Sequence, residues 1–597
     1  MQQPNNTEEF LRLISSSHTE DKWRGLLMAT GAVRNWTEEE VLAVLENIGN
    51  SFLVGLLENS EKQRDVKSNE SADLISLSLS LLASSCVSHK VCQGKFWSDL
   101  LPHLANMILR ESKTRREQEQ LQVGILTERV VNCWIVVCSV CSVQDELLHW
   151  FLKNSSLQKC MVELCKHMVK NETLFNNSQK QKQLVQLVVG MSYLALVLSK
   201  TIEAIRVRML LPHMLLVVVV FFDRLREPSV SLDIIHQLYL LSPYFCSIFR
   251  NEKQRCMKSV VWQLDGHLRN AIEYSLSNRL NDALRHKLFS IVVGELKIWK
   301  LFEFNFTENM LSTSSLWRYM RLLLFMCSVE LGVHLREVLR APMDSLENEN
   351  NREIHLVNIF QVIELSIDLL QRRMIETEEQ PSESLRAEER EEVKVIEALV
   401  ENIQVIVDFL EAEPLKREQK DDRQYIRLFK YSIVGFRIVC CFSSLQLPVL
   451  EKRISLVLVY SWNTILDDFE VILTSIEWDI LYDLISWTGF GVTRLIEYSD
   501  IAMKTFECEI FSRVWIQLLQ EFVKNRSIIS TMTGSIPVTQ VIYNIIEILV
   551  CLYEFPSNRR YINDHKDTLM SIRTLWPSEE LKKLFTSDEV SHVVASQ

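Results

Sequence analysis

Glycine and proline are scarce along the whole chain, with only 14 glycines and 12 prolines in 597 residues. The fractions 14/597 and 12/597 are each slightly above 2%, against typical values of about 7% and 5%. Sheets with tight hairpins need these residues at their turns. A chain of this length also exceeds what one core can use, so we expect several domains or one extended repeat structure. Helices with short polar connections are the simplest solution.

Hydrophobic spacing predicts one amphipathic helix after another. The stretch "NWTEEEVLAVLENIG" shows the pattern most clearly. Thr37 stands as an N-cap with Glu40 three residues later, which is a capping box, and Gly49 stands where a C-terminal cap is expected. Between them, one buried stripe is predicted at Val41, Leu42, Leu45 and Ile48.

The segment "LISLSLSLLASSC" (74–86) alternates strictly, which is a strand signal. It is nevertheless long, rich in leucine and nearly free of β-branched residues, so we predict a helix. Further helices are predicted near 97–110, 120–141, 156–169, 178–199, 210–226, 252–276, 280–299, 314–340, 350–374, 384–412, 422–443, 446–470, 501–524 and 537–553. With no convincing strand pair and no strict repeat period, the sequence predicts an all-α, armadillo- or HEAT-like α-solenoid of stacked antiparallel helix pairs.

Acidic, polar segments interrupt the helical pattern at 343–353 and 376–392. The second, "ETEEQPSESLRAEEREE", is predicted to be an exposed linker. We therefore expect the N-terminal part of the solenoid at 1–375, the acidic linker at 376–392 and the C-terminal part at 393–597.

Two long apolar runs, "LVQLVVGMSYLALVL" (184–198) and "MLLPHMLLVVVVFF" (209–222), raise the question of a membrane hairpin. A spanning helix needs about 20 apolar residues, whereas runs of 10–14 more often form buried core helices. Pro212, His213 and close flanking charges also disfavour a span. We predict no transmembrane span and expect 209–222 to be among the most buried residues. Peripheral membrane association through a 184–222 hairpin stays open as an alternative.

The net charge of −12 and the lack of a basic stripe argue against a nucleic-acid partner. The N-terminus "MQQPNNTEEFLRL" lacks the pattern of a secretory signal, which leads us to expect a cytoplasmic protein. The 14 cysteines, such as Cys133, Cys138, Cys327 and Cys551, are then expected to be reduced, buried thiols. Adjacent Cys440 and Cys441 are placed at a buried helix end.

No motif for catalysis or cofactor binding stands out. HExxH, P-loop and G-x-S-x-G motifs are absent, and "GFGV" (489–492) lacks a third glycine and a preceding strand. The best metal candidate combines Cys138 and Cys141 with Cys160, Cys165 and His167, but its spacing does not fit a zinc knuckle. Single histidines fall on helical patterns at His213, His236, His286 and His334. We predict no enzyme and no catalytic, cofactor-binding or metal-binding residue, with a helical enzyme or zinc protein with a cryptic site as an alternative.

The N-terminal stretch 8–58 resembles the opening of the neurochondrin family. The resemblance rests on a Leu-rich helix with Leu26, Leu27, Ala32 and Val33, followed by Gly49, Phe52, Leu56 and Leu57. Later landmarks follow in the family's order, including "LRHKLFSIVVGELKIWKLF" and "LWRYMRLLLFMCSVELGVHL" with the Val329–Glu330 pair. Gly332 departs from the family, which tends to carry an arginine there.

This resemblance implies an armadillo-like, cytosolic, non-enzymatic protein that binds signalling proteins. The family is associated with neurite outgrowth and with partners that include a calcium/calmodulin-dependent kinase and receptor tails. The resemblance therefore implies a scaffold or adaptor in the cytosol, with neuronal projections as a further location. It supplies no catalytic or ligand residue.

Overall fold

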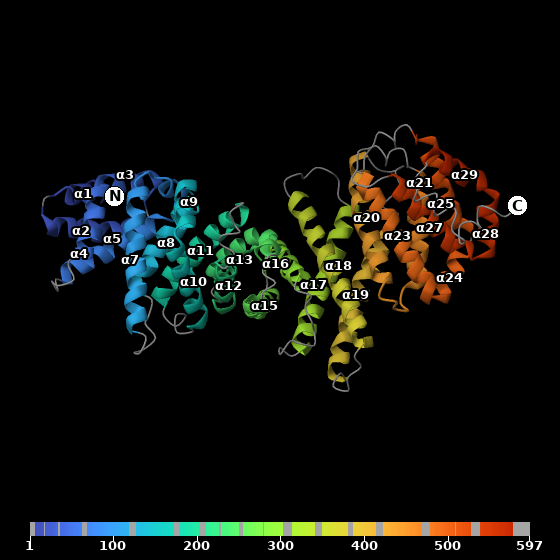
Figure 1. The fold of residues 1–597 in the computed structure, drawn as a ribbon, viewed down its shortest axis with the longest axis horizontal. Helices are drawn as coiled ribbons and strands as arrows, with labels where there is room; N and C mark the ends of the chain where they lie inside the picture. The colour runs from blue at the N-terminus through green and yellow to red at the C-terminus, as the bar shows by residue number, and fades with distance from the viewer. Residues whose placement is uncertain are drawn as a thin grey trace. The chain divides into compact units, whose positions relative to one another are not determined.

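The computed structural model describes residues 6–576 with gaps at 17, 34–35, 63–68, 119–126, 172–177, 202–209, 226–227, 250–254, 279, 302–312, 341–348, 380–385, 413–421, 468–477, 508 and 527–537. All regular elements in these ranges are helices, and no strand occurs among them (Figure 1). The prediction of an all-α protein is confirmed.

The helices fall into two compact units, Met1–Glu303 and Phe304–Gln597. The first contains α1 (Asn6–Ile14), α2 (Thr19–Ala32), α3 (Glu38–Ile48), α4 (Asn50–Lys62), α5 (Asn69–Ser85), α6 (His89–Cys92), α7 (Trp97–Gln118), α8 (Glu128–Cys141), α9 (Asp145–Lys153), α10 (Ser155–Lys170), α11 (Ser178–Lys200), α12 (Leu210–Arg224), α13 (Pro228–Leu241), the 3₁₀ helix η4 (Ser242–Tyr244), α14 (Phe245–Phe249), α15 (Arg255–Leu276) and α16 (Asp282–Leu301). The second contains α17 (Thr313–Arg340), α18 (Glu349–Glu379), α19 (Arg386–Glu411), α20 (Asp422–Ser443), α21 (Glu451–Asp467), α23 (Trp478–Tyr498), α24 (Asp500–Phe506), α25 (Glu509–Lys524), α27 (Val538–Tyr553), α28 (Pro556–Asp564) and α29 (Lys566–Leu575).

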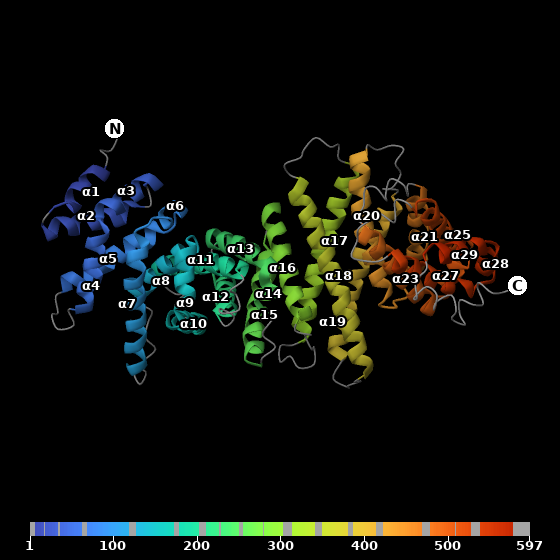
Figure 2. The ribbon, with the colours of Figure 1, turned by 45° about the horizontal axis from the view of Figure 1, so that its top comes forward.

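Each unit is a stack of helices in two layers. In the first unit one layer runs α2, α5, α8, α11, α13, α16, and the other runs α4, α7, α10, α12, α15, with each helix packed on the next in its layer. In the second unit the layers are α17, α19, α21, α25, α29 and α18, α20, α23, α27, α28. Figure 2 shows α17, α18 and α19 lying side by side at the start of this stack. Two layers built by stepwise stacking are the architecture of an α-solenoid, as the sequence predicts.

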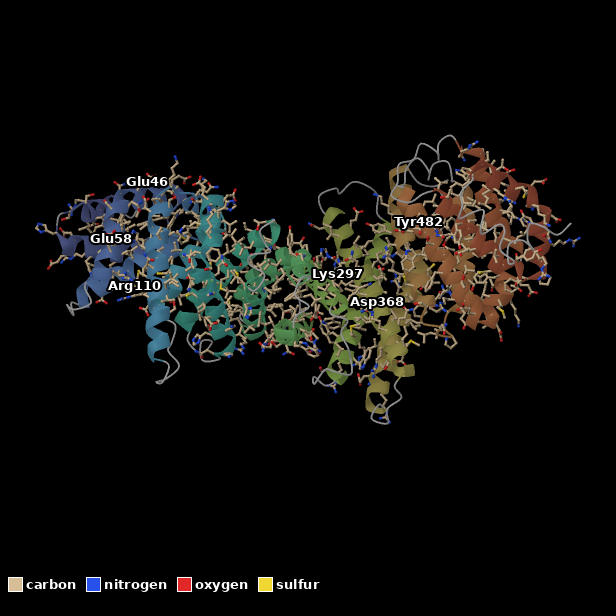
Figure 3. The ribbon with its side chains drawn as sticks, in the orientation of Figure 1. Glu46, Glu58, Arg110, Lys297, Asp368 and Tyr482 are labelled. Atoms are coloured by element: carbon tan, nitrogen blue, oxygen red, sulfur yellow. The ribbon has the colours of Figure 1, made fainter. Side chains whose placement is uncertain are left out.

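The local signals that start and end α3 work as predicted. The backbone N–H of Thr37 donates to Glu40 Oε2 at 2.7 Å, and the N–H of Glu40 donates to Thr37 Oγ1 at 3.3 Å. Gly49 ends the helix with a φ of +77°, which other residues rarely adopt. The buried stripe contains Val44 and not the predicted Leu42, which is half-buried. Glu46, on the other side of the helix, is exposed (Figure 3).

Residues 74–85 of the alternating segment form most of α5 and are helical, as predicted, while Cys86 lies in the turn after the helix. Its buried residues include Leu74, Ile75, Leu79 and Leu82, which follow the helical period despite the local alternation. The alternation arises because serines occupy the positions between the leucines. It therefore does not set the backbone conformation.

The apolar run 209–222 forms α12, and its described residues 210–222 are all buried. The helix contacts α10, α11, α13 and α15, so neighbours cover it on most sides. Burying each Val, Leu or Phe side chain contributes about 1.5–3 kcal/mol. The prediction that this run lies among the most buried residues is confirmed for 210–222, while Met209 lies outside the described residues.

The other apolar run lies in α11 (Ser178–Lys200), which polar residues extend by six positions before the run and by two positions after it. Gln181–Lys200 is long and apolar enough to cross a membrane by length and composition, and half of it is buried inside the protein. The expectation that this segment is too short for a span is therefore wrong for the helix as a whole. Its buried residues Leu187, Val188 and Met191 belong to a helix that packs on α8, α12 and α13, as core helices do.

The acidic segment 376–392 is divided between two helices. Residues 376–379 end α18 and residues 386–392 begin α19, while 380–385 lie outside the described residues. The division of the solenoid at this segment, with parts 1–375 and 393–597, stays a prediction.

A buried charged network joins α15 to α16 in the first unit. Arg269 Nη2 donates to Asp265 Oδ2 at 2.7 Å, and Trp299 Nε1 donates to Asp265 Oδ1 at 2.6 Å. Burial raises the pKa of Asp265, against the opposing influence of Arg269 and Trp299. All three side chains are buried, so the hydrogen bonds and the ion pair within the network replace the hydrogen bonds that these groups would make to water.

Asp265→Ala is expected to lower the free energy of unfolding by about 3–5 kcal/mol, because the Arg269 charge stays buried without its carboxylate. The measurement is the urea midpoint of the circular dichroism signal. Asp282→Ala is the control, since Asp282 forms its ion pair with Arg285 at the surface and surface pairs contribute little. Equal effects of the two variants would contradict the role of the buried network.

Candidate functional site

One side of α17 exposes large apolar side chains. Phe325, Val329 and Val333 are 55%, 45% and 50% exposed. Because they are spaced four residues apart, they lie above one another on a single side of the helix. Leu322 is half-buried on the same side. We call these four residues the α17 face.

The opposite side of α17 is also apolar. Leu324, Cys327 and Leu331 are fully buried where α17 packs against α18 and α19. The core needs only one apolar side, so the α17 face is not explained by packing within the second unit. A contiguous exposed apolar surface of this kind commonly marks an interaction site.

Two arginines, Arg318 and Arg336, lie on the same side of α17 at the two ends of the α17 face, and both are exposed. They are 18 residues apart, which corresponds to about 27 Å along a helix. Between them, a Cβ atom added to Gly332 would meet no atom within 4 Å. The side of α17 is therefore apolar and open in its middle, and basic at its ends.

The acidic side chains near these arginines already have basic partners. Glu337 Oε2 lies 3.8 Å from Arg352 Nη1, and Glu391 pairs with Arg321 at 3.6 Å and with Lys394 at 2.7 Å. Side-chain hydrogen bonding to Lys394 is the main cause that lowers the pKa of Glu391. Arg318 also acts on Glu391 electrostatically, so this carboxylate offsets part of the positive charge at that end of the α17 face.

The structure places the single histidines of the sequence in different settings. His213 is buried within α12, and His286 lies on α16. Burial lowers the pKa of His236 on α13, with a smaller effect from Lys287. His334 is not isolated, because it lies beside Glu330 and beside His355 of α18. Sequence reasoning missed His355, and the i, i+4 spacing of Glu330 and His334 was the only local signal.

The cysteines proposed as a metal site are mostly buried thiols. Cys138, Cys141 and Cys165 are buried, and burial raises the pKa of each thiol. Cys160 is half-buried with its Sγ 3.2 Å from Ser112 Oγ, and His167 Nε2 lies 3.5 Å from Asn171 Nδ2. These surroundings favour protonated, packed thiols over thiolate ligands.

Other candidate positions also lie in packed helices. Cys133, Cys327, Cys440 and Cys441 are buried free thiols, and Cys551 is half-buried. Burial raises the pKa of Cys133 to about 12. The "GFGV" segment lies inside α23, where Gly489 faces Ile548 and Gly491 faces Cys440. Its glycines therefore serve close helix packing in this structure.

The packing of the helices defines the class of the protein as a two-layer helical repeat protein. No family model and no curated protein matches the sequence. Solved structures that align with it include a circular tandem repeat protein (12% identity, 83% of this chain and 97% of the other, TM-score 0.21). The structure of Kap121p aligns at 10% sequence identity over 99% of this chain and 74% of Kap121p, with a TM-score of 0.19. A structure of the SYS-1/POP-1 complex aligns at 12% sequence identity over 96% of this chain and 99% of the other chain, with a TM-score of 0.18.

Gly332→Ala is expected to raise the free energy of unfolding by about 0.5–1 kcal/mol, since alanine favours the helix and nothing occupies the space. Gly294→Ala on α16 is the comparison variant and is expected to lower the free energy of unfolding. Its Cβ would lie 2.7 Å from Phe245 Cδ2 and 3.1 Å from the Ser242 carbonyl oxygen. Thermal unfolding measures both. A loss of stability in Gly332→Ala would contradict an open surface at this point of α17.

Proposed function

We propose that this protein is a non-enzymatic helical scaffold that docks partner proteins on the α17 face. The observation that carries the proposal is the row Phe325, Val329 and Val333, three large apolar side chains exposed on one side of one helix. A partner that covered this row would gain about 1.5–3 kcal/mol of binding free energy for each side chain fully removed from water. Because α17 begins the stack of the second unit, the rest of that unit holds it in place.

The partner proposed is an acidic amphipathic helix. An apolar row with a spacing of about four residues matches the i, i+3, i+4, i+7 anchors by which helices bind to apolar surfaces. Arg318 and Arg336 would then meet carboxylates near the two ends of that helix. Their separation of about 27 Å corresponds to about five helical turns. The open space over Gly332 would let the partner's backbone approach closely.

The wider cellular role is proposed from the resemblance to the neurochondrin family alone. On that basis the protein would act in the cytosol, bind signalling kinases or receptor tails, and contribute to neurite outgrowth. Membership of this family stays a prediction. The net charge of −12 supports protein partners over nucleic acid.

Association with a membrane surface through α11 and α12 is the second candidate function. The composition of Gln181–Lys200 favours it. The complete burial of residues 210–222 disfavours it, because those side chains would have to leave the core to reach lipid. Carbonate extraction separates the two candidates: a chain embedded in the membrane interface through this hairpin stays in the membrane pellet, and deletion of 184–222 releases it.

The docking proposal predicts that Phe325→Asp with Val329→Asp weakens partner binding by at least tenfold, because a buried apolar anchor contributes about 1–2 kcal/mol or more. A photo-crosslinking residue at Val333 identifies the bound segment, and titration of that segment as a peptide gives the affinity. We expect an acidic peptide with apolar residues at helical spacing.

Ile501→Asp with Met570→Asp is the matched control, since both residues are similarly exposed on α24 and α29. The control should bind as the unchanged protein does. Equal binding by the Phe325/Val329 variant, or a crosslinked segment without apolar helical spacing, would refute docking at the α17 face.

A further inference from the structure

A buried carboxylate and two imidazoles meet between α17 and α18. Glu330 Oε2 lies 3.4 Å from His334 Nε2, one turn later on α17, and 3.3 Å from His355 Nε2 on α18. The two imidazole rings are 5.0 Å apart at an angle of 80°. One carboxylate oxygen thus faces a nitrogen of each ring.

The three side chains are almost completely removed from water. The side chain of His355 is 0% exposed, that of Glu330 is 7% exposed and that of His334 is 12% exposed. Burying an ionised carboxylate is costly unless a positive charge or a metal compensates it. An imidazolium beside Glu330 would supply one compensating charge, and a divalent cation would supply two.

The distances also match the spacing of ligand atoms around a metal ion. Tetrahedral zinc with ligands at about 2.0–2.1 Å separates its ligand atoms by about 3.3–3.4 Å. Both distances from Glu330 Oε2 have this value. At least one ring nitrogen of His334 lies within 4.8 Å of a ring nitrogen of His355.

A second carboxylate faces the other nitrogen of His334. Glu337 Oε2 lies 3.8 Å from His334 Nδ1, and Arg352 Nη1 lies 3.8 Å from Glu337 Oε2. Histidines that bind metals commonly direct their other ring nitrogen toward a carboxylate, which orients the ring and raises its basicity. Glu337 is placed for this role.

We propose that Glu330, His334 and His355 bind a zinc ion that fastens α17 to α18. Two imidazole nitrogens and one carboxylate oxygen form a recognised zinc ligand set, which leaves a fourth position for water or another ligand. The ion would connect two helices whose intervening residues, 341–348, contribute none of the three ligands. This inference concerns the buried side of α17 and is independent of docking on the α17 face.

The test uses the full-length protein, stripped with EDTA, dialysed and titrated with zinc chloride by calorimetry. We expect one zinc per chain, a higher melting temperature with zinc, and the visible absorption of a tetrahedral site when cobalt replaces zinc. His355→Gln and His334→Gln are each expected to weaken binding at least 100-fold. Because His355 is fully buried, the slightly exposed His334 provides the variant that preserves the fold, verified by circular dichroism.

Two further variants distinguish zinc binding at this cluster from zinc binding at the buried thiols. Cys138→Ser with Cys141→Ser removes the alternative thiol ligands and should leave zinc binding unchanged, whereas Glu337→Gln should weaken it by about tenfold. No zinc uptake by folded, stripped protein would overturn the proposal in favour of a hydrogen-bonded Glu–His cluster. Unchanged affinity in folded His334→Gln would overturn it equally.

Discussion

The structure depends on covering the apolar sides of its helices with other helices. The helices of each two-layer stack pack on their neighbours in their own layer, and most also pack on helices of the other layer. The helix α12 needs such cover on nearly all sides because it is apolar all round, and α10, α11, α13 and α15 supply it. The charged network at Asp265 belongs to the same interior, where polar groups are stable only with fixed partners.

The α17 face is one place in the second unit where this cover is incomplete. Leu324, Cys327 and Leu331 satisfy the packing of α17 on its inner side, while Phe325 and Val329 remain in water. The same helix holds Glu330 and His334 beside His355 of α18. One helix thus carries an exposed apolar row on one side and, on another, a buried Glu–His cluster that contacts α18.

Local and periodic signals in the sequence predicted much of the fold. The capping box of Thr37 and Glu40 and the leucine-rich composition of 74–86 predicted α3 and α5 correctly, because both act within a few residues. The candidate site was not predictable in the same way. Hydrophobic period identifies an apolar side but not whether another helix covers it, so the exposure of Phe325 could not be derived. His355 follows Glu330 by 25 residues, and only the packing of α18 on α17 brings them together.

The central claim is that partners bind the α17 face, and side-chain footprinting of a purified complex tests it most directly. Hydroxyl radicals are expected to modify both Phe325 and Met570 in the isolated protein, since both side chains are exposed, and each rate serves as the reference for the same residue in the complex. In the complex, the account predicts strong protection of Phe325 with little change at Met570. Equal modification of Phe325 in the complex and in the isolated protein would contradict the account.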